Sequence, residues 1–184
     1  MIVLSGASAS GKTEVAKILA KKYGIEKIIT TTTRTMRVNE QNGRDYFFVS
    51  KDEFEKLIKA DHFVEYTFYN GNYYGSSKDQ INSNKCVVID PSGLKAYINL
   101  NDPSIVTFLL EATEKTRYNR MILRGDSEEN ANARIQNDRQ VFEQEKMEKM
   151  VDVIIDSENY NLDEMAKYVI KKYNEILANR QLRK

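Results

Sequence analysis

The sequence predicts a three-layer α/β fold with a mainly parallel sheet, and two observations support this class. Short apolar runs alternate with longer segments whose apolar residues recur at helical spacing, and the alternation continues to the end of the chain. The stretch 32–80 departs from this pattern, because it is aromatic and polar and has strands of antiparallel type. The 184 residues suggest one domain, and we expect this stretch to be an insertion between two parallel strands.

The strands are predicted from short runs of apolar, β-branched or aromatic residues. Residues 1–5, which read MIVLS, are the first of these, and their continuous apolar character is typical of a buried strand. A turn at Asn70 and Gly71 is expected to separate two strands of the aromatic stretch. The expected strands are residues 1–5, 26–33, 46–50, 62–69, 72–76, 85–90, 104–112 and 151–156.

The helices are predicted from apolar residues at helical spacing and from capping residues at the helix ends. Gly24 is expected to end the first helix as a C-cap, and Thr113 is expected to begin the fourth as an N-cap. Ser50 and Glu53 have the spacing of a capping box. The expected helices are residues 12–24, 50–60, 92–99, 113–125, 127–150 and 161–180.

The composition excludes several functional classes. The formal net charge is +1 with 30% charged residues, so the chain has no general basic field for nucleic acid and no polybasic membrane patch. It has no apolar run long enough to cross a bilayer and no signal-peptide pattern. Cys86 is the one cysteine, so an internal disulfide is excluded, and we interpret this residue as part of the core. His62 has no second His or Cys with which to form a zinc site. These features predict a cytoplasmic protein.

Residues 6–13, GASASGKT, fit the G-x-x-x-x-G-K-[ST] pattern of a phosphate-binding loop. The pattern requires a strand before it and a helix after it, and both are expected here. Backbone N–H groups of such a loop bind a polyphosphate, together with the N-terminal end of the helix. Lys12 is expected to reach the β- and γ-phosphates, and Thr13 to coordinate Mg²⁺. The expected ATP-binding residues of the loop are Gly6, Ala7, Ser8, Ala9, Ser10, Gly11, Lys12 and Thr13.

The segments that follow the phosphate loop resemble, in their order and spacing, those of the guanylate kinase family. They read TTTTRTMR, GRDYFFVS, FVEYTFYNGNYYGSS and VVID, and NRMILRG and ARIQND resemble the arginine-bearing lid. The resemblance covers nearly the whole chain. It implies a P-loop kinase fold with a core of residues 1–31, 81–124 and 143–184, a nucleoside-monophosphate-binding insertion at 32–80 and a helical lid at 125–142.

By resemblance, Arg34, Arg37, Tyr46 and Tyr74 hold the phosphate of GMP. The chemistry agrees with this assignment, because guanidinium forks suit phosphate oxygens and phenolic hydroxyls add further donors. Without the two tyrosines, Arg34 and Arg37 would be interpreted as a solvated basic loop, since exposed charges are ordinary.

The resemblance assigns recognition of the guanine base to Glu65, Thr30, Ser76 and Asp90. Guanine presents two donors beside the O6 acceptor, so a carboxylate can accept from both donors while a hydroxyl donates to O6. Asp90 can accept from the exocyclic amine. Without the motif, Glu65 would be interpreted as a surface residue on an alternating strand.

The lid is expected to bring arginines to the transferring phosphoryl group. Arg120, Arg124 and Arg134 match the family positions, and Arg120 is also expected at the ATP site. Arg139 is an additional candidate without a clear match. The alternative is that these arginines lie on amphipathic helix faces and pair with Glu128, Glu129 or Glu143.

Several positions depart from the family pattern. Met36 replaces a typical proline, and Asn39 replaces a glycine. Val88 stands where the family often has another acidic residue, which leaves Thr13, the phosphates, water and Asp90 as candidates to hold Mg²⁺. The segments DPSG and VIIDSENYN also differ, so the resemblance does not define the adenine side of the ATP site.

The expected reaction is ATP-dependent phosphorylation of GMP, and also of deoxy-GMP, in purine nucleotide metabolism. Lys12, Arg34, Arg124 and Arg134 are the expected catalytic residues and Mg²⁺ the cofactor, because the protein's task is in-line positioning and charge neutralisation. The expected partners are ATP and GMP, with no nucleic acid or membrane, and the protein is expected to be a monomer or a homodimer.

Two alternatives remain open. One is a P-loop kinase of another phosphorylated acceptor, such as a ribose bisphosphate, which should lack the guanine-reading set that Glu65, Thr30 and Ser76 supply here. The other is a non-catalytic guanylate-kinase-like module that binds phosphopeptides. Such modules typically have a degraded phosphate loop, whereas Lys12 and Thr13 are intact.

Overall fold

The larger of two sheets has five strands in the order β2-β7-β1-β8-β9, and every pairing in it is parallel. The computed structural model describes residues 1–69, 71–145 and 147–182. The five strands are β1 (Ile2–Gly6), β2 (Glu26–Lys27), β7 (Lys85–Val88), β8 (Val106–Glu111) and β9 (Val153–Asp156). The expected three-layer α/β fold with a mainly parallel sheet is confirmed.

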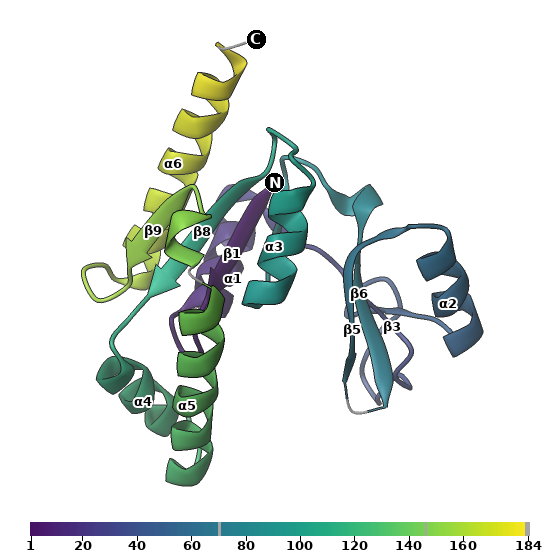
Figure 1. Ribbon diagram of the computed structural model, residues 1–184, viewed down its shortest axis with the longest axis horizontal. Helices are drawn as coiled ribbons and strands as arrows, with labels where there is room; N and C mark the ends of the chain where they lie inside the picture. Colours follow the sequence, from purple (N-terminus) through teal and green to yellow (C-terminus); the bar gives the residue numbers. More distant parts are fainter. Residues whose placement is uncertain (70, 146, 183–184) are drawn as a thin grey trace.

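Helices cover both faces of this sheet, as Figure 1 shows. On one face lie α1 (Lys12–Tyr23) and α6 (Leu162–Gln181), and on the other lies α3 (Pro91–Asn99). Successive residues of β1 point to opposite faces, so Ile2 and Leu4 pack with the first pair of helices and Val3 packs with α3. Cys86 lies in the first of these clusters, and burial raises the pKa of its thiol to about 11, which confirms it as a core residue.

The smaller sheet has the strand order β4-β3-β6-β5 and lies with α2 to one side of the larger sheet (Figure 1). Its elements are β3 (Thr31–Thr32), β4 (Phe47–Phe48), α2 (Lys51–Lys59), β5 (Phe63–Tyr69), β6 (Asn72–Ser77) and the 3₁₀ turn η1 (Lys78–Gln80). The β5–β6 pairing is antiparallel, as expected for this stretch, and the Ser50–Glu53 capping box of α2 is confirmed. Asn70, at the expected turn, lies outside the described residues.

Residues 26–33 do not form the single strand that their composition predicts. They divide into β2 in the larger sheet and β3 in the smaller one. At the break, the side-chain amide of Gln80 donates to the Ile29 carbonyl and accepts from the Ile29 N–H, at 2.8 Å in both cases. A side chain therefore replaces the ladder partner of Ile29, and the chain can leave one sheet and enter the other.

The helices α4 (Glu114–Leu123) and α5 (Glu128–Glu145) form a hairpin at the end of the larger sheet where the phosphate loop lies (Figure 1). The Thr113 side chain caps α4, as expected. The helix α5 ends before the expected residue 150, and the 3₁₀ turn η2 (Met147–Lys149) comes after it. The two helices pack against each other through a small buried cluster of Met121, Ala131 and Ile135. None of the helices in the described part of the chain has the length and apolar character needed to cross a membrane.

Candidate functional site

The phosphate loop follows β1, the central strand, at the carboxyl end of the sheet, where ligands bind in open parallel α/β sheets. Gly6 has φ 145°, and a Cβ there would lie 2.2 Å from the carbonyl oxygen of Leu110. Only glycine fits at this point of close approach. Ala9 has φ 61° and Gly11 has φ 104°, so the loop holds left-handed conformations that turn it before α1 begins.

The ammonium of Lys12 lies over this loop. It donates to the carbonyl oxygens of Gly6 at 2.6 Å and Ala7 at 2.8 Å. Burial lowers the pKa of Lys12 to about 8, although the negative charge of Asp138 opposes the change. Thr13 is exposed in the first turn of α1, where the N-terminal end of the helix favours anions. The loop therefore presents a cation and a hydroxyl to one cavity.

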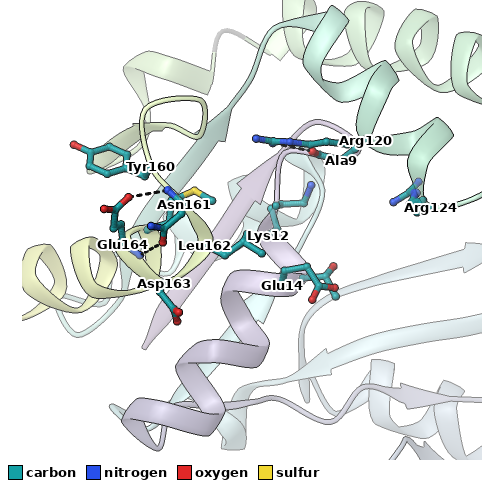
Figure 2. A pocket seen from close by; sticks show the side chains of 13 residues that line it. Ala9, Lys12, Glu14, Arg120, Arg124, Tyr160, Asn161, Leu162, Asp163 and Glu164 are labelled. Atoms are coloured by element: carbon teal, nitrogen blue, oxygen red, sulfur yellow. Dashed lines mark hydrogen bonds between the residues drawn. The ribbon is translucent and has the colours of Figure 1, made fainter.

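That cavity has a volume of about 940 Å³ and lies between the phosphate loop, α4 and the start of α6 (Figure 2). Arg120 crosses its edge, donating to the Ala9 carbonyl at 3.2 Å and to the Ser157 carbonyl at 3.1 Å. Arg124 also lines the cavity, and its guanidinium is 2.6 Å from Asp126. The lining residues are Ala9, Gly11, Lys12, Thr13, Glu14, Arg120, Arg124, Tyr160, Asn161, Leu162, Asp163, Glu164 and Met165.

The segment Tyr160–Leu162 lines this cavity, although the sequence predicts no role for any of its residues because the segment departs from the family pattern. Figure 2 shows Tyr160 and Asn161 at the start of α6, on the side of the cavity away from Arg124. Asn161 and Glu164 form a capping box, with the Asn161 side chain accepting from the Glu164 N–H at 2.9 Å. The N-x-x-E spacing was the available signal for the start of α6, and it fixes where this wall of the cavity begins.

A second cavity, of about 370 Å³, contains Glu65 and Asp90. Glu65 on β5 is opposite Ser76 on β6, and the Ser76 hydroxyl donates to Glu65 Oε1 at 2.5 Å. Burial raises the pKa of Glu65, the hydrogen bond from Ser76 opposes this, and the charge of Asp90 adds to the rise. One carboxylate oxygen is thus held by Ser76, and the carboxylate is oriented within the cavity.

The other two expected base-reading residues differ in their placement. Asp90 is the N-cap of α3, where its side chain accepts from the Gly93 N–H at 2.8 Å, and it also lines the second cavity. Thr30 is half-buried between β2 and β3, and its carbonyl accepts from the Phe47 N–H. It is not among the residues that line this cavity. Glu65 and Asp90 line this cavity, and Ser76 donates to Glu65 from outside it. Thr30 directly precedes Thr31, which pairs with Gly75 in the antiparallel β3–β6 ladder, so Thr30 lies beside Ser76.

The expected phosphate clamp is assembled around Arg34. Its guanidinium is 2.7 Å from Glu40 and lies over the rings of Tyr46, at 5.2 Å, and Phe48, at 5.5 Å. The hydrogen bond to Glu40 raises the pKa of Arg34. The ring of Tyr74 meets that of Tyr46 edge-on, with the ring centroids 6.2 Å apart. Arg34, Tyr46 and Tyr74 therefore lie together, and the guanidinium of Arg34 already forms an ion pair with Glu40.

Arg37 is exposed on the same loop, and its backbone N–H donates to Glu40 at 2.8 Å. The Glu40 carboxylate thus contacts both expected arginines: it accepts from the side chain of Arg34 and from the backbone N–H of Arg37. This role was not expected from the sequence, although an acidic residue six positions after an arginine in a polar loop was the available signal.

The lid arginines have separate environments. Arg134 is exposed on α5 and does not line the cavity that contains Arg120 and Arg124. Arg139, the additional candidate, is 2.6 Å from Glu114 on α4. Arg139 therefore forms an ion pair on the face of a helix, and this pair joins the two helices of the hairpin.

A third cavity, of about 550 Å³, shares lining residues with each of the first two. Lys12 lines it and also lines the cavity at the start of α6, while Asp90 lines it and also lines the cavity that contains Glu65. The described residues hold no group of three or more His, Cys, Asp or Glu side chains that could bind a metal ion.

Comparison with known proteins agrees on one family. The sequence profile described as guanylate kinase matches residues 1–175. A guanylate kinase of Fusobacterium nucleatum is 35% identical over 165 residues, which are 86% of this chain and 88% of that protein. One of Wolinella succinogenes is 36% identical over 145 residues, covering 73% of this chain and 67% of that protein. The crystal structure of guanylate kinase from Anaplasma phagocytophilum matches with a TM-score of 0.65 at 22% identity, over 98% of this chain and 85% of that one, and supports the fold.

Proposed function

This chain belongs to the guanylate kinase family, and on that premise we propose that it transfers the terminal phosphoryl group of ATP to GMP, forming ADP and GDP. The observation that carries the proposal is a series of three neighbouring cavities that share lining residues. Lys12 lines both the cavity beside the phosphate loop and the central one, and Asp90 lines both the central one and the cavity that contains Glu65. We therefore propose that a donor phosphate and an acceptor phosphate meet beside Lys12.

The acceptor end is suited to guanine. The Glu65 oxygen that Ser76 does not hold can accept from the N1–H or the exocyclic amine of the base. Asp90 shares this cavity and offers a further acceptor for the amine. Adenine presents an acceptor at N1, which would face the same carboxylate unfavourably. We therefore propose that Glu65 selects GMP and deoxy-GMP over AMP.

The phosphate of the acceptor is proposed to bind at Arg34, Arg37, Tyr46 and Tyr74. The guanidinium of Arg34 is always positively charged, Glu40 holds it in place by hydrogen bonds, and the rings of Tyr46 and Phe48 lie against it. An incoming phosphate would share or replace Glu40 as the anionic partner. Charge-assisted hydrogen bonds of this kind are among the stronger ones in proteins.

Charge that develops on the transferring group is proposed to be stabilised by Lys12, Arg124 and Arg134. Lys12 and Arg124 line the cavity beside the phosphate loop, while Arg134 stands on α5 and would reach it after a movement of the lid. Mg²⁺, held by Thr13 together with substrate oxygens and water, would neutralise charge on the phosphates. No side-chain nucleophile is needed in such a transfer. We also propose a cytoplasmic role in purine nucleotide metabolism, by a monomer or homodimer.

A coupled assay of ADP release tests the proposal with GMP, deoxy-GMP, AMP and a ribose bisphosphate as acceptors. The expected result is the highest kcat/KM with GMP or deoxy-GMP, and almost complete loss in Lys12→Ala, which removes the phosphate-loop cation. A higher kcat/KM with the ribose bisphosphate would identify the protein as a P-loop kinase of another phosphorylated acceptor. The absence of ADP release with every acceptor, from a folded protein that binds a phosphopeptide, would identify the non-catalytic module.

A further inference from the structure

Asp138 belongs to α5, but its carboxylate lies against the phosphate loop. The Ser8 N–H donates to Asp138 Oδ2 at 2.7 Å, and the Ser8 hydroxyl approaches Oδ1 at 3.3 Å. Asp138 is only 9% exposed. A backbone N–H of the phosphate loop is therefore held by a buried side chain that enters from the lid hairpin.

Arg117 on α4 completes this contact. Its guanidinium donates to Asp138 Oδ2 at 2.8 Å, and Arg117 is 5% exposed. A buried carboxylate is costly unless it is paired and hydrogen-bonded, and here both conditions are met. The phosphate loop, α4 and α5 thus meet at a single carboxylate. The other ion pair of the hairpin, between Arg139 and Glu114, is exposed, and neither of its side chains lines the cavities around Lys12.

Asp138 also acts on the charge of Lys12. Burial lowers the pKa of Lys12, as do the positive charges of Arg117 and Arg124, whereas the negative charge of Asp138 raises it. Asp138 and Lys12 line the same central cavity. The charged side chains around Lys12 are Asp138 on α5, Arg117 and Arg120 on α4, Arg124 at the C-cap of α4, Glu14 on α1, Asp90 at the start of α3, and Asp163 and Glu164 on α6.

The position of Asp138 on α5 relates it to the proposed catalytic arginine of the lid. Arg134 precedes Asp138 by four residues, so both lie on one side of the helix. Anchoring Asp138 on Ser8 therefore sets the rotation of α5 about its axis, and with it the direction of Arg134.

We propose that Asp138 is a positioning residue for phosphoryl transfer: held by Arg117, it fixes the Ser8 end of the phosphate loop and sets where α5, the helix that carries Arg134, meets that loop. The inference rests on the proposed function. Asp138 acts through the loop and α5, and it touches no reacting atom. Arg117 neutralises the carboxylate, so that the phosphates of ATP meet an ion pair and not a free negative charge.

The first test compares Asp138→Asn with wild type and with Glu114→Gln, which weakens the exposed ion pair of the same hairpin. Asp138→Asn keeps the size of the side chain and removes its charge. We expect kcat to fall by about tenfold, while KM for GMP stays within about twofold of wild type, because Asp138 contacts the phosphate loop and not the acceptor cavity. Glu114→Gln should retain wild-type kinetics. A kcat of Asp138→Asn within about twofold of wild type overturns the proposal.

A second variant separates positioning from folding. Arg117→Met combined with Asp138→Leu removes both buried charges, and replacement of a buried ion pair by apolar residues is often neutral or stabilising. We expect a folded protein, by circular dichroism and thermal unfolding, whose kcat stays about tenfold below wild type because the link to Ser8 is lost. Recovery of kcat to within about twofold of wild type would show that the pair serves only stability.

The proposed function is decided separately from this inference. Wild type in the same assay, with GMP and with no acceptor, tests the reaction itself. Binding of ATP by calorimetry needs no acceptor, so it reports the phosphate loop whichever acceptor the enzyme uses. We expect Asp138→Asn to bind ATP about tenfold more weakly than Glu114→Gln does. Equal ATP affinity in these two variants would overturn the role assigned to Ser8.

Discussion

Lys12 donates to two carbonyl oxygens of its own loop, and burial lowers its pKa to about 8. We expect kcat/KM for ATP to fall as the pH rises through about 8, because the free enzyme then loses the ammonium that attracts the phosphates. Bound phosphates favour the charged form, so kcat should persist to higher pH. Initial rates across about pH 6.5–9.5 provide the measurement.

The control for this profile is Lys12→Ala. Its residual kcat/KM should be low and should lack the limb near pH 8, since the titrating group has been removed. A wild-type kcat/KM that stays level to about pH 9.5 would show that the charge of Lys12 does not limit capture of ATP.

Glu65 is the residue that we propose recognises the base. Glu65→Gln keeps the size but removes the charge and one acceptor, so one of the two guanine donors would face an amide N–H. The expected loss is about 1.5–3 kcal/mol, or about 10–150-fold in kcat/KM for GMP. AMP could gain slightly, because the amide can donate to its N1.

The pH dependence gives this prediction an independent check. Burial raises the pKa of Glu65, so wild type should bind GMP less well as the pH falls through that raised value, because the protonated carboxyl loses acceptor capacity. Glu65→Gln should lack this acidic weakening. If GMP efficiency in Glu65→Gln stays within about twofold of wild type, the base is read by another residue.

At the scale of elements, the loop between β3 and β4 carries the proposed acceptor-phosphate residues and lines neither the cavity beside the phosphate loop nor the central cavity. We expect Arg34→Ala to weaken GMP by about 1.5–3 kcal/mol, since a charged hydrogen-bond partner of the phosphate is lost, and to leave ATP affinity nearly unchanged. Arg44→Ala is a matched control, because Arg44 lies on the same loop in an exposed pair with Asp45. Titrations in which Arg34→Ala weakens both nucleotides equally would contradict the assignment.

The helix α2 depends on its capping box for its start. Ser50 accepts from the Glu53 N–H, and the Glu53 side chain accepts from the Ser50 N–H at 2.8 Å. Ser50→Ala should lower the free energy of unfolding by about 1 kcal/mol, because helix N–H groups lose their partner. Ser83→Ala, at an exposed serine outside the helices, should change it by less than about 0.5 kcal/mol. Denaturant unfolding measures both, and equal effects would mean that the box adds nothing specific.

At the scale of the whole molecule, the proposed substrates lie between parts that can move separately. The smaller sheet stands to one side of the larger one and the α4–α5 hairpin stands at its end (Figure 1). We expect the radius of gyration to decrease when a bisubstrate analogue fills the three neighbouring cavities, because closure excludes water from the phosphoryl group. Small-angle scattering measures this, with ATP alone as the comparison. An unchanged radius at saturation would count against closure.

Much of the fold follows from local sequence. The apolar run before Gly6, the helical spacing after Lys12 and the capping box at Ser50 each act over a few residues, and the structure confirms all three. The phosphate loop belongs to the same class in part: its positive φ values at Ala9 and Gly11 are local, whereas the carbonyl of Leu110 on β8 is what requires a glycine at position 6. Local patterns are predictable because near neighbours in the chain are near neighbours in space.

The tertiary structure decided which distant partner each polar group meets. Gln80 breaks the strand expected at residues 26–33 by bonding Ile29, which lies 51 positions earlier. Asp138 reaches Ser8 across 130 positions. No spacing in the sequence specifies such pairs, because they form only once packing of the apolar faces has set the helices against the sheet. From the sequence alone, any of several polar or charged side chains could have been the partner. The sequence by itself therefore determined the phosphate loop and the alternation of strands and helices. The packing of the folded chain decided how the acceptor pocket and the lid are joined to that loop.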